Sequence, residues 1–388
     1  MRNFLSDRIV AIPPSGIRKF FDIVSEMPEA ISLGVGEPYF DTPWKIREEG
    51  IYSLERGKTF YTSNSGLTEL RQAICDFSRR KYGMNYEEKE CLVTIGGSEA
   101  IDIAFRAILN PGEEVVVVQP CFVSYAPCVI LAGGVPVYLN LSAENEFKLT
   151  REALESVITE KTKAVIMSFP NNPTGAIMTK EELEPIADLI KEKDLLVISD
   201  EIYAELTYGS THASIATFPD MKERSIVING FSKAFAMTGW RLGYALGPKD
   251  IMRQMTKIHQ YAIMAAPTTS QYAAIQAMKD CDNEVEEMRT SYNQRRRYLL
   301  KAFERMNLKC FEAKGAFYMF PSIEEFGITS EEFATRLLEE EKLAVVPGSA
   351  FGECGEGHIR ISYAYSINEL KEALGRIERF ITRLRENK

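Results

Sequence analysis

A lysine and an aspartate in this chain lie where side chains of their kinds can do chemistry. Lys233 follows a run of apolar residues and is flanked by Phe231 and Phe235. Burial beside such rings lowers the basicity of an amine and makes it a usable nucleophile, although a lysine can also extend its charged end to the surface. Asp200 ends another apolar run. A carboxylate there must find a partner, which can be a ligand, a helix start or an internal cation.

Two glycines followed by a helical pattern predict a place for an anion. Gly96 and Gly97 follow an apolar run and precede Ser98. The first backbone N–H groups of a helix lack partners within it, and the helix dipole favours negative charge there. The same residues also fit a tight turn in which Ser98 caps the helix. Arg241, eight residues after Lys233, adds a fixed cation close to another predicted strand.

An amide and a hydroxyl complete the set. Asn171 and Asn172 follow a predicted strand, where Asn, Pro and Gly also form ordinary turns, and Tyr203 lies three residues after Asp200. An amine, a carboxylate, an amide, a hydroxyl and an anion site together suit pyridoxal phosphate. The amine would form a Schiff base, the carboxylate would keep the pyridine nitrogen protonated, and Asn and Tyr would bond the phenolic oxygen.

The candidate residues follow the strands of one predicted sheet. Short apolar runs alternate with amphipathic helical patterns from about residue 90 to 250. This alternation predicts an α/β fold with a mostly parallel central sheet covered by helices on both faces. Ligands bind beyond the carboxyl ends of such strands, so we expect the candidates to meet at one edge. The expected strands are 92–95, 115–118, 135–139, 164–168, 195–199, 225–229 and 242–246.

The pattern changes after about residue 285. A charged helical stretch covers 284–304, strands are predicted at 316–320 and 359–363, and helices follow Thr329 and Ser366. A chain of 388 residues exceeds one ordinary core. We therefore expect two domains. A large cofactor-binding domain covers 46–285, and a smaller α+β domain with an N-terminal arm combines 1–45 and 286–388.

Composition excludes several classes of function. The net charge of −9 argues against nucleic acid or an anionic membrane as a partner. Seven scattered cysteines without a CxxC pair, and three histidines without HExxH, predict neither a disulfide framework nor a metal site. No apolar run is long enough for a signal peptide or a membrane span, so we expect a cytoplasmic protein.

Several motifs in this order resemble one family. They read SFPNNPTG at 168–175, DEIY at 200–203 and FSKAFAMTGWRLGY at 231–244, with LGVGEP at 33–38 and HIRIS at 358–362. The chain thus resembles the class I/II aminotransferases of fold type I over essentially its whole length. The segment 12–20 is similar to that of the prokaryotic aromatic and aspartate aminotransferases.

The resemblance implies roles for single residues. Lys233 is implied to carry the cofactor and to move a proton between Cα and C4′, with Asp200 and Tyr203 as further catalytic residues. Gly36, Asn172 and Arg360 are implied to bind substrate, with Arg360 gripping the α-carboxylate by a bidentate fork. The implied cofactor contacts are Gly97, Ser98, Glu99, Phe122, Asn172, Asp200, Tyr203, Ser232, Lys233 and Arg241. Phe122 is implied to stack on the pyridine ring, although a core phenylalanine also fits.

The resemblance further implies a homodimer with active sites at the subunit interface. Tyr61 would then reach the neighbour's phosphate, and the loop 257–267 would help to line the neighbour's pocket. One departure concerns the entrance loop, where the family often has Asp and this chain has Tyr39. We expect Tyr39 to bear on substrate choice and not on the catalytic set.

The substrates implied by the resemblance are an amino acid and a 2-oxo acid such as 2-oxoglutarate. Aromatic donors are favoured and aspartate comes next. Arg18 could supply a second cation for a dicarboxylate, but it also fits a surface helix. Two other functions stay open, because the same cofactor chemistry serves a β-C–S lyase or a cyclising synthase, and the fold also occurs in regulators that are not enzymes.

Overall fold

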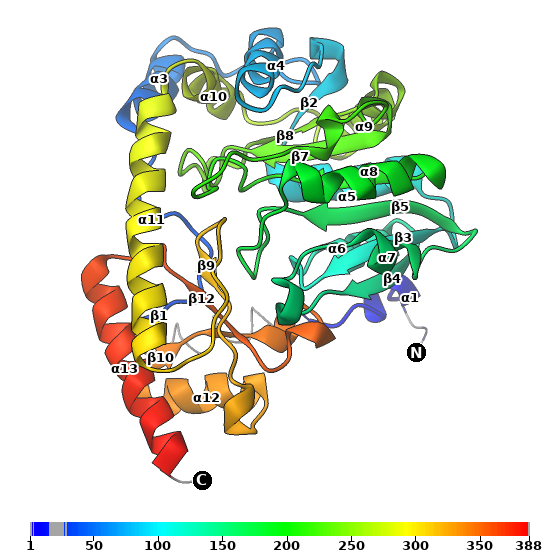
Figure 1. Cartoon of the computed structure of the whole chain (residues 1–388). Coiled ribbons are helices and arrows are strands. Elements are labelled where there is room, and N and C mark those ends of the chain that lie inside the picture. Colours follow the sequence, from blue (N-terminus) through cyan, green and yellow to red (C-terminus); the bar gives the residue numbers. More distant parts are fainter. Residues whose placement is uncertain (1, 3, 15–26, 28, 387–388) are drawn as a thin grey trace.

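A seven-stranded sheet forms the centre of the computed structural model, which describes residues 2, 4–14, 27 and 29–386 (Figure 1). Its strand order is β2-β8-β7-β6-β5-β3-β4, and β8 alone runs opposite to its neighbours. The predicted mostly parallel sheet is therefore confirmed. The strands are β2 (Cys91–Thr94), β3 (Glu114–Gln119), β4 (Val135–Asn140), β5 (Thr162–Ser168), β6 (Leu196–Asp200), β7 (Ser225–Gly230) and β8 (Gly243–Leu246).

Helices cover both faces of this sheet. Successive side chains of a strand point to opposite faces, so Val115 and Val117 of β3 join one core cluster while Val116 and Val118 join another. The first cluster holds α5 (Gly96–Ile108), α6 (Tyr125–Leu131) and α9 (Lys249–Ala262), and the second holds α7 (Arg151–Glu155) and α8 (Lys180–Glu192). Burial on both faces explains why these strands are continuous apolar runs.

Small sheets and long helices make up the rest of the chain. β11, β12 and β9 form an antiparallel sheet, and β1 pairs in parallel with β10. Figure 1 shows α11 running from the helices beside the large sheet to α12 and α13 beside the small sheets. The strands are β1 (Ile31–Ser32), β9 (Tyr318–Met319), β10 (Leu343–Ala344), β11 (Val346–Pro347) and β12 (Ile359–Ser362). The helices are α1 (Asp7–Val10), α3 (Trp44–Glu55), α4 (Thr68–Tyr82), α10 (Thr268–Asp280), α11 (Asp282–Arg305), α12 (Ser330–Glu341) and α13 (Ile367–Glu386).

The sequence-based elements differ from the structure in a few places. The strand predicted at 316–320 is reduced to two residues, since Ala316 adopts a left-handed backbone with φ of 56°. β1, β10 and β11 were not predicted, because each has only two residues and depends on a distant partner. In the described part of the chain, no helix has both the length and the apolar character needed to cross a membrane.

Candidate active site

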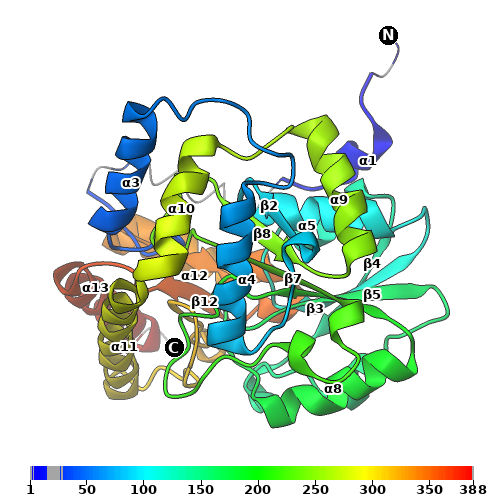
Figure 2. The ribbon, with the colours of Figure 1, turned by 90° about the horizontal axis from the view of Figure 1, so that it is seen from above.

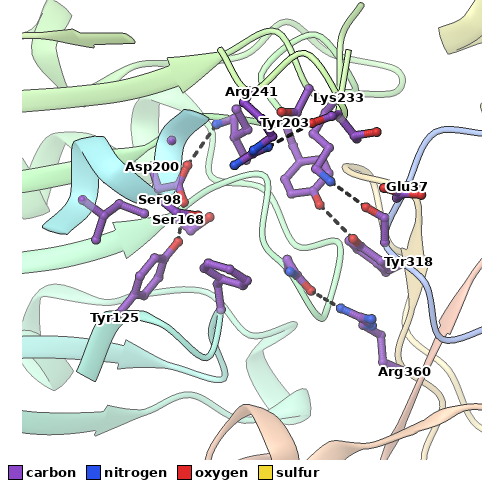
Figure 3. A pocket seen from close by; sticks show the side chains of 18 residues that line it. Glu37, Ser98, Tyr125, Ser168, Asp200, Tyr203, Lys233, Arg241, Tyr318 and Arg360 are labelled. Atoms are coloured by element: carbon purple, nitrogen blue, oxygen red, sulfur yellow. Dashed lines mark hydrogen bonds between the residues drawn. The ribbon is translucent and has the colours of Figure 1, made fainter. Parts of the chain in front are cut away.

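A cavity of about 350 Å³ opens at the carboxyl ends of β5, β6 and β7, where it also meets β9 and β12 (Figure 3). Most of the predicted site residues line it, although they come from distant parts of the sequence. They are Gly36, Gly97, Ser98, Phe122, Asn172, Asp200, Tyr203, Ser232, Lys233, Arg241 and Arg360. The expectation that the candidates meet at one edge of the sheet is therefore correct.

Lys233 lies in a turn after β7 that two phenylalanines anchor in the core. Phe231 and Phe235 are 0% and 1% exposed, and their ring centroids lie 5.8 Å apart. With its flanking residues buried, the lysine side chain extends into the cavity, where Nζ donates to the Gly36 carbonyl oxygen over 2.5 Å. The amine thus does not reach the surface.

The surroundings of Lys233 favour its neutral form. Burial lowers the pKa of Lys233 to about 8, because the ammonium form loses hydration. Glu37 and Asp200 act to raise this pKa, and the Arg360 and Arg241 guanidinium groups act to lower it. At pH 7 about a tenth of the amine is then unprotonated, far more than for an ordinary lysine, and this neutral form is the nucleophile.

Asp200 ends β6 and is 5% exposed. Tyr125 Oη donates to its Oδ2 over 2.6 Å, and the backbone N–H of Ile202 donates to Oδ1 over 3.2 Å. Burial raises the pKa of Asp200 to about 6 despite these two bonds. Tyr125 is a site residue that the sequence did not reveal, since its contact depends on α6 packing beside the end of β6.

The start of α5 forms one end of the cavity, which Gly97 and Ser98 line. The helix begins at Gly96, which has φ of 74°. β8 passes so close that a Cβ on Gly243 would lie 2.6 Å from the Gly96 carbonyl carbon. The alternative in which Ser98 caps the helix is wrong, because Ile95 precedes the first turn and Ser98 lies inside it. The backbone N–H groups of Gly97 and Ser98 therefore have no partner within the helix and can donate to a ligand.

A cation and two hydroxyls stand beside that helix start. A Cβ on Gly96 would lie 2.8 Å from Arg241 Nη2, so the guanidinium covers the glycine turn. Arg241 Nη1 also donates to the Thr238 carbonyl oxygen over 2.9 Å. Ser232 and Thr238 line the same end of the cavity. Helix N-terminus, guanidinium and hydroxyls together suit a phosphate group.

At the opposite end, Arg360 of β12 is 3% exposed. Its Nη1 donates to Asn172 Oδ1 over 2.9 Å and its Nη2 to the Gly34 carbonyl oxygen over 2.5 Å, while Nε has no hydrogen-bond partner. The structure records no ion pair between Arg360 and a described carboxylate. A buried cation without a counter-ion is costly, so this end suits a carboxylate ligand.

The two asparagines of the turn at 169–175 have different tasks. Asn171 stabilises the turn, because its Oδ1 accepts from the Thr174 hydroxyl over 2.7 Å and its Nδ2 donates to the Pro120 carbonyl oxygen over 3.1 Å. Asn172 instead lines the cavity. Since Asn172 Oδ1 accepts from Arg360, its Nδ2 amide is left to donate to a ligand.

Tyr318 of β9 is a second residue that sequence reasoning missed. Its hydroxyl lies 2.8 Å from that of Tyr203, and its ring centroid lies 4.4 Å from the Arg360 guanidinium carbon. A Cβ on Gly36 would collide with this hydroxyl, which explains why the facing loop has a glycine there. Tyr318 thus joins the small sheet to the residues around Lys233 (Figure 3).

Several predicted residues lie elsewhere. The Glu99 side chain does not line the cavity; it bonds to Ile95 and to His259. Tyr61 is 84% exposed and lies outside the cavity. Tyr39 also lies outside it and packs on Arg295, whose guanidinium carbon is 4.4 Å from the ring centroid. Arg18 falls outside the described residues. No group of three His, Cys, Asp or Glu side chains in the described residues could hold a metal ion.

Comparison with known proteins agrees with this geometry. An aspartate aminotransferase of Pyrococcus abyssi is 47% identical over 99% of each chain. An aromatic-amino-acid aminotransferase of Thermococcus litoralis is 45% identical over 97% of this chain and 98% of its own. The crystal structure of an aromatic aminotransferase from Pyrococcus horikoshii superposes with a TM-score of 0.90 and 46% identity, covering 94% of this chain and 99% of that one.

The family profile described as "Aminotransferase class I and II" matches residues 28–377. This match spans the central sheet and the small sheets together, and it includes every residue that lines the cavity. The chain therefore belongs to the class I and II aminotransferase family.

Proposed function

We propose that this aminotransferase binds pyridoxal phosphate in the cavity and moves the amino group of an aromatic amino acid to a 2-oxo acid. One observation carries the proposal: Lys233, with a pKa lowered to about 8, lies in one cavity with buried Asp200 and Arg360. An amine, an acid and a cation around one small volume are what the reaction requires.

The donor groups fit the cofactor. The α5 start with Ser232 and Arg241 would hold the phosphate, Asp200 would face the pyridine nitrogen, and Asn172 with Tyr203 would bond the phenolic oxygen. When bound, the cofactor acts as an electron sink that makes the Cα–H bond of an amino acid acidic. Lys233 would accept the Cα proton and return it at C4′.

The substrate carboxylate would bind Arg360. Its buried guanidinium has no described carboxylate partner, and Asn172 and Gly34 fix two of its nitrogens. This geometry supports bidentate recognition of an amino acid and of the 2-oxo acid that replaces it. No observation favours a β-C–S lyase, a cyclising synthase or a regulator.

An aromatic donor is proposed first and aspartate second. The described cations that line the cavity are Lys233, Arg241 and Arg360, and each already has a task in the proposed chemistry. A second substrate carboxylate would thus find no further cation among them, whereas Phe122 and Tyr318 offer aromatic surface. The named relatives include enzymes of both substrate classes.

We also propose a homodimer in which Tyr61 completes the neighbour's site. Phe60, Tyr61 and Tyr261 are 81%, 84% and 84% exposed. The segments that bear them are tied together, since Asn64 Nδ2 donates to the Met264 carbonyl oxygen over 2.8 Å. Large exposed rings on linked segments support an interface. The division into domains at 46–285, and at 1–45 with 286–388, likewise stays a prediction.

The test is an absorbance titration of the purified protein reconstituted with pyridoxal phosphate. We expect a yellow band that bleaches to the pyridoxamine form with Tyr or Phe at lower concentration than with Asp, Glu, Ala or Met, and that returns with 2-oxoglutarate. The absence of the band would overturn the cofactor assignment. Bleaching by Asp at the lowest concentration would overturn the aromatic preference alone.

A further inference from the structure

Glu99 stabilises the first turn of α5 through a hydrogen bond to the residue that precedes the helix. Its carboxylate accepts the backbone N–H of Ile95, the residue before the helix, over 2.5 Å. Ile95 has no side-chain acceptor for the N–H groups of Gly97 and Ser98, and Glu99 satisfies only the N–H of Ile95 itself, as the acidic partner of a capping box does. Because this bond goes to Ile95, and Glu99 does not line the cavity, the N–H groups of Gly97 and Ser98 stay available to a ligand.

His259 of α9 holds that carboxylate in place. The two helices pack side by side (Figure 2), the His259 residue is 0% exposed, and its Nδ1 lies 2.6 Å from Glu99 Oε1. Its Nε2 is buried and has no hydrogen-bond partner in the described structure. A proton on Nδ1 donates to Glu99 and leaves an acceptor at Nε2, which is a smaller cost than a buried unpaired N–H.

His259 also fixes the end of α9. Its carbonyl oxygen accepts the N–H groups of Ile263 and Met264 over 2.8 and 3.0 Å. Met264 has φ of 75°, and its own carbonyl oxygen accepts from Asn64. One buried residue therefore ties the start of α5 to the segment that follows α9.

We propose that Glu99 and His259 are positioning residues for the phosphate of the cofactor, an inference that rests on the proposed function. Their first task is geometric, because the free N–H groups of Gly97 and Ser98 must point at the phosphate oxygens within hydrogen-bond reach. Their second task is electrostatic. A carboxylate and a phosphate dianion share the same helix N-terminus, and His259 keeps the Glu99 carboxylate directed to the rear, away from the phosphate.

The test compares two ligands that differ only in the phosphate. Cofactor-free wild type, His259→Leu and His259→Asn are titrated with pyridoxal phosphate and with pyridoxal, which both react with Lys233. We expect His259→Leu to raise the Kd for pyridoxal phosphate about tenfold and the Kd for pyridoxal less than about twofold. His259→Asn retains an N–H donor near Nδ1, so its Kd should stay within about threefold of wild type.

Asp102→Asn is the matched control. Asp102 lies one turn further along α5 and pairs with Arg106 at 2.9 Å, so both Kd values should stay at the wild-type level. In the ³¹P spectrum, the signal of the bound phosphate should shift in His259→Leu and not in Asp102→Asn. If His259→Leu does not fold, Glu99→Gln replaces it, and it too should raise the Kd for pyridoxal phosphate more than the Kd for pyridoxal. An amide has one oxygen where the carboxylate has two, so its NH2 group would face one of the two donors, Ile95 N–H or His259 Nδ1–H.

If His259→Leu raised the Kd for pyridoxal phosphate and the Kd for pyridoxal equally, the inference would be overturned, because the whole site would then be damaged. If His259→Asn weakened the binding of pyridoxal phosphate as much as His259→Leu does, the inference would also be overturned. The packing of the His259 ring, and not its N–H donor, would then be what matters. Failure of the wild type to bind pyridoxal phosphate is a separate result that would overturn the proposed function itself.

Discussion

The α5 end of the cavity combines backbone N–H groups with an exposed guanidinium, whereas the charged groups further along the cavity, Asp200 and Arg360, are buried. Arg241, the cation at the α5 end, is exposed, while Arg360 is 3% exposed. The exposed Arg241 side chain is solvated before a ligand arrives. The buried groups have shifted pKa values and incomplete bonding, which is how a protein makes side chains reactive. In the proposed function, the binding of the phosphate and the chemistry therefore take place in two different environments.

The largest expected effect comes from removing the buried amine. Lys233→Ala should lower turnover by at least about a thousandfold, because no other group would move the Cα proton. The cofactor should still bind through the α5 end, as measured by equilibrium dialysis with pyridoxal phosphate. Lys163→Ala is the control, since Lys163 lies at the amino end of β5, opposite the end that meets the cavity, and pairs with Glu113. Activity near wild type in Lys233→Ala would disprove the role of this lysine.

Arg360→Lys should reduce kcat/KM for the amino acid about 100-fold, because an ammonium group cannot reproduce the planar fork. Steady-state kinetics and a pyridoxal phosphate titration would separate the two ligands. The affinity for the cofactor should change by less than about threefold. If Arg360→Lys weakened the binding of the amino acid and of pyridoxal phosphate equally, Arg360 would support the fold of the cavity and would not bind the substrate.

Tyr125→Phe should weaken pyridoxal phosphate binding about tenfold near pH 6, with a smaller effect at pH 8. The Tyr125 bond lowers the pKa of Asp200, which burial holds at about 6, so removing the bond raises this pKa. When the pH is lowered, Asp200 of the variant therefore becomes protonated at a higher pH than Asp200 of the wild type. Cofactor affinity measured from pH 5 to 8 should fall off at higher pH in the variant. Coincident profiles would contradict the coupling between Tyr125 and Asp200.

Arg241→Ala should have the smallest effect, raising the Kd for pyridoxal phosphate about fivefold. Water and salt screen this exposed side chain, and the α5 backbone would still bind the phosphate. Raising the salt concentration should shrink the difference between the variant and wild type. A loss larger than that of Tyr125→Phe would break the proposed contrast between the exposed and the buried end.

The central sheet could be predicted from the sequence because its strands are buried on both faces. Runs such as 115–118 and 164–168 are shorter than a typical helix and consist almost entirely of apolar residues, and the structure extends them by only one or two residues. The strands β1, β10 and β11 carry no such signal. Their pairing, such as Ile31 with Leu343, is decided by tertiary contacts.

The lining of the site could be predicted where a motif names the residue, as for Lys233 and Asn172. The supporting contacts could not. Tyr125 and Tyr318 reach the site from elements whose neighbours are unknown until the chain has folded. Glu99 shows the limit most clearly, because it lies beside Ser98 in sequence but His259, far along the chain, determines its direction.

The hydrogen bonds that close the cavity also have a consequence for biosynthesis. Lys233 bonds to Gly36, and Arg360 bonds to Asn172 and to Gly34, across 197, 188 and 326 residues of chain. These contacts can form only after segments far apart in the sequence have come together. A nascent chain that ends at residue 359 already contains every residue proposed to hold the cofactor, but it lacks Arg360. The end of the cavity proposed for the substrate carboxylate is therefore the last to be completed during synthesis.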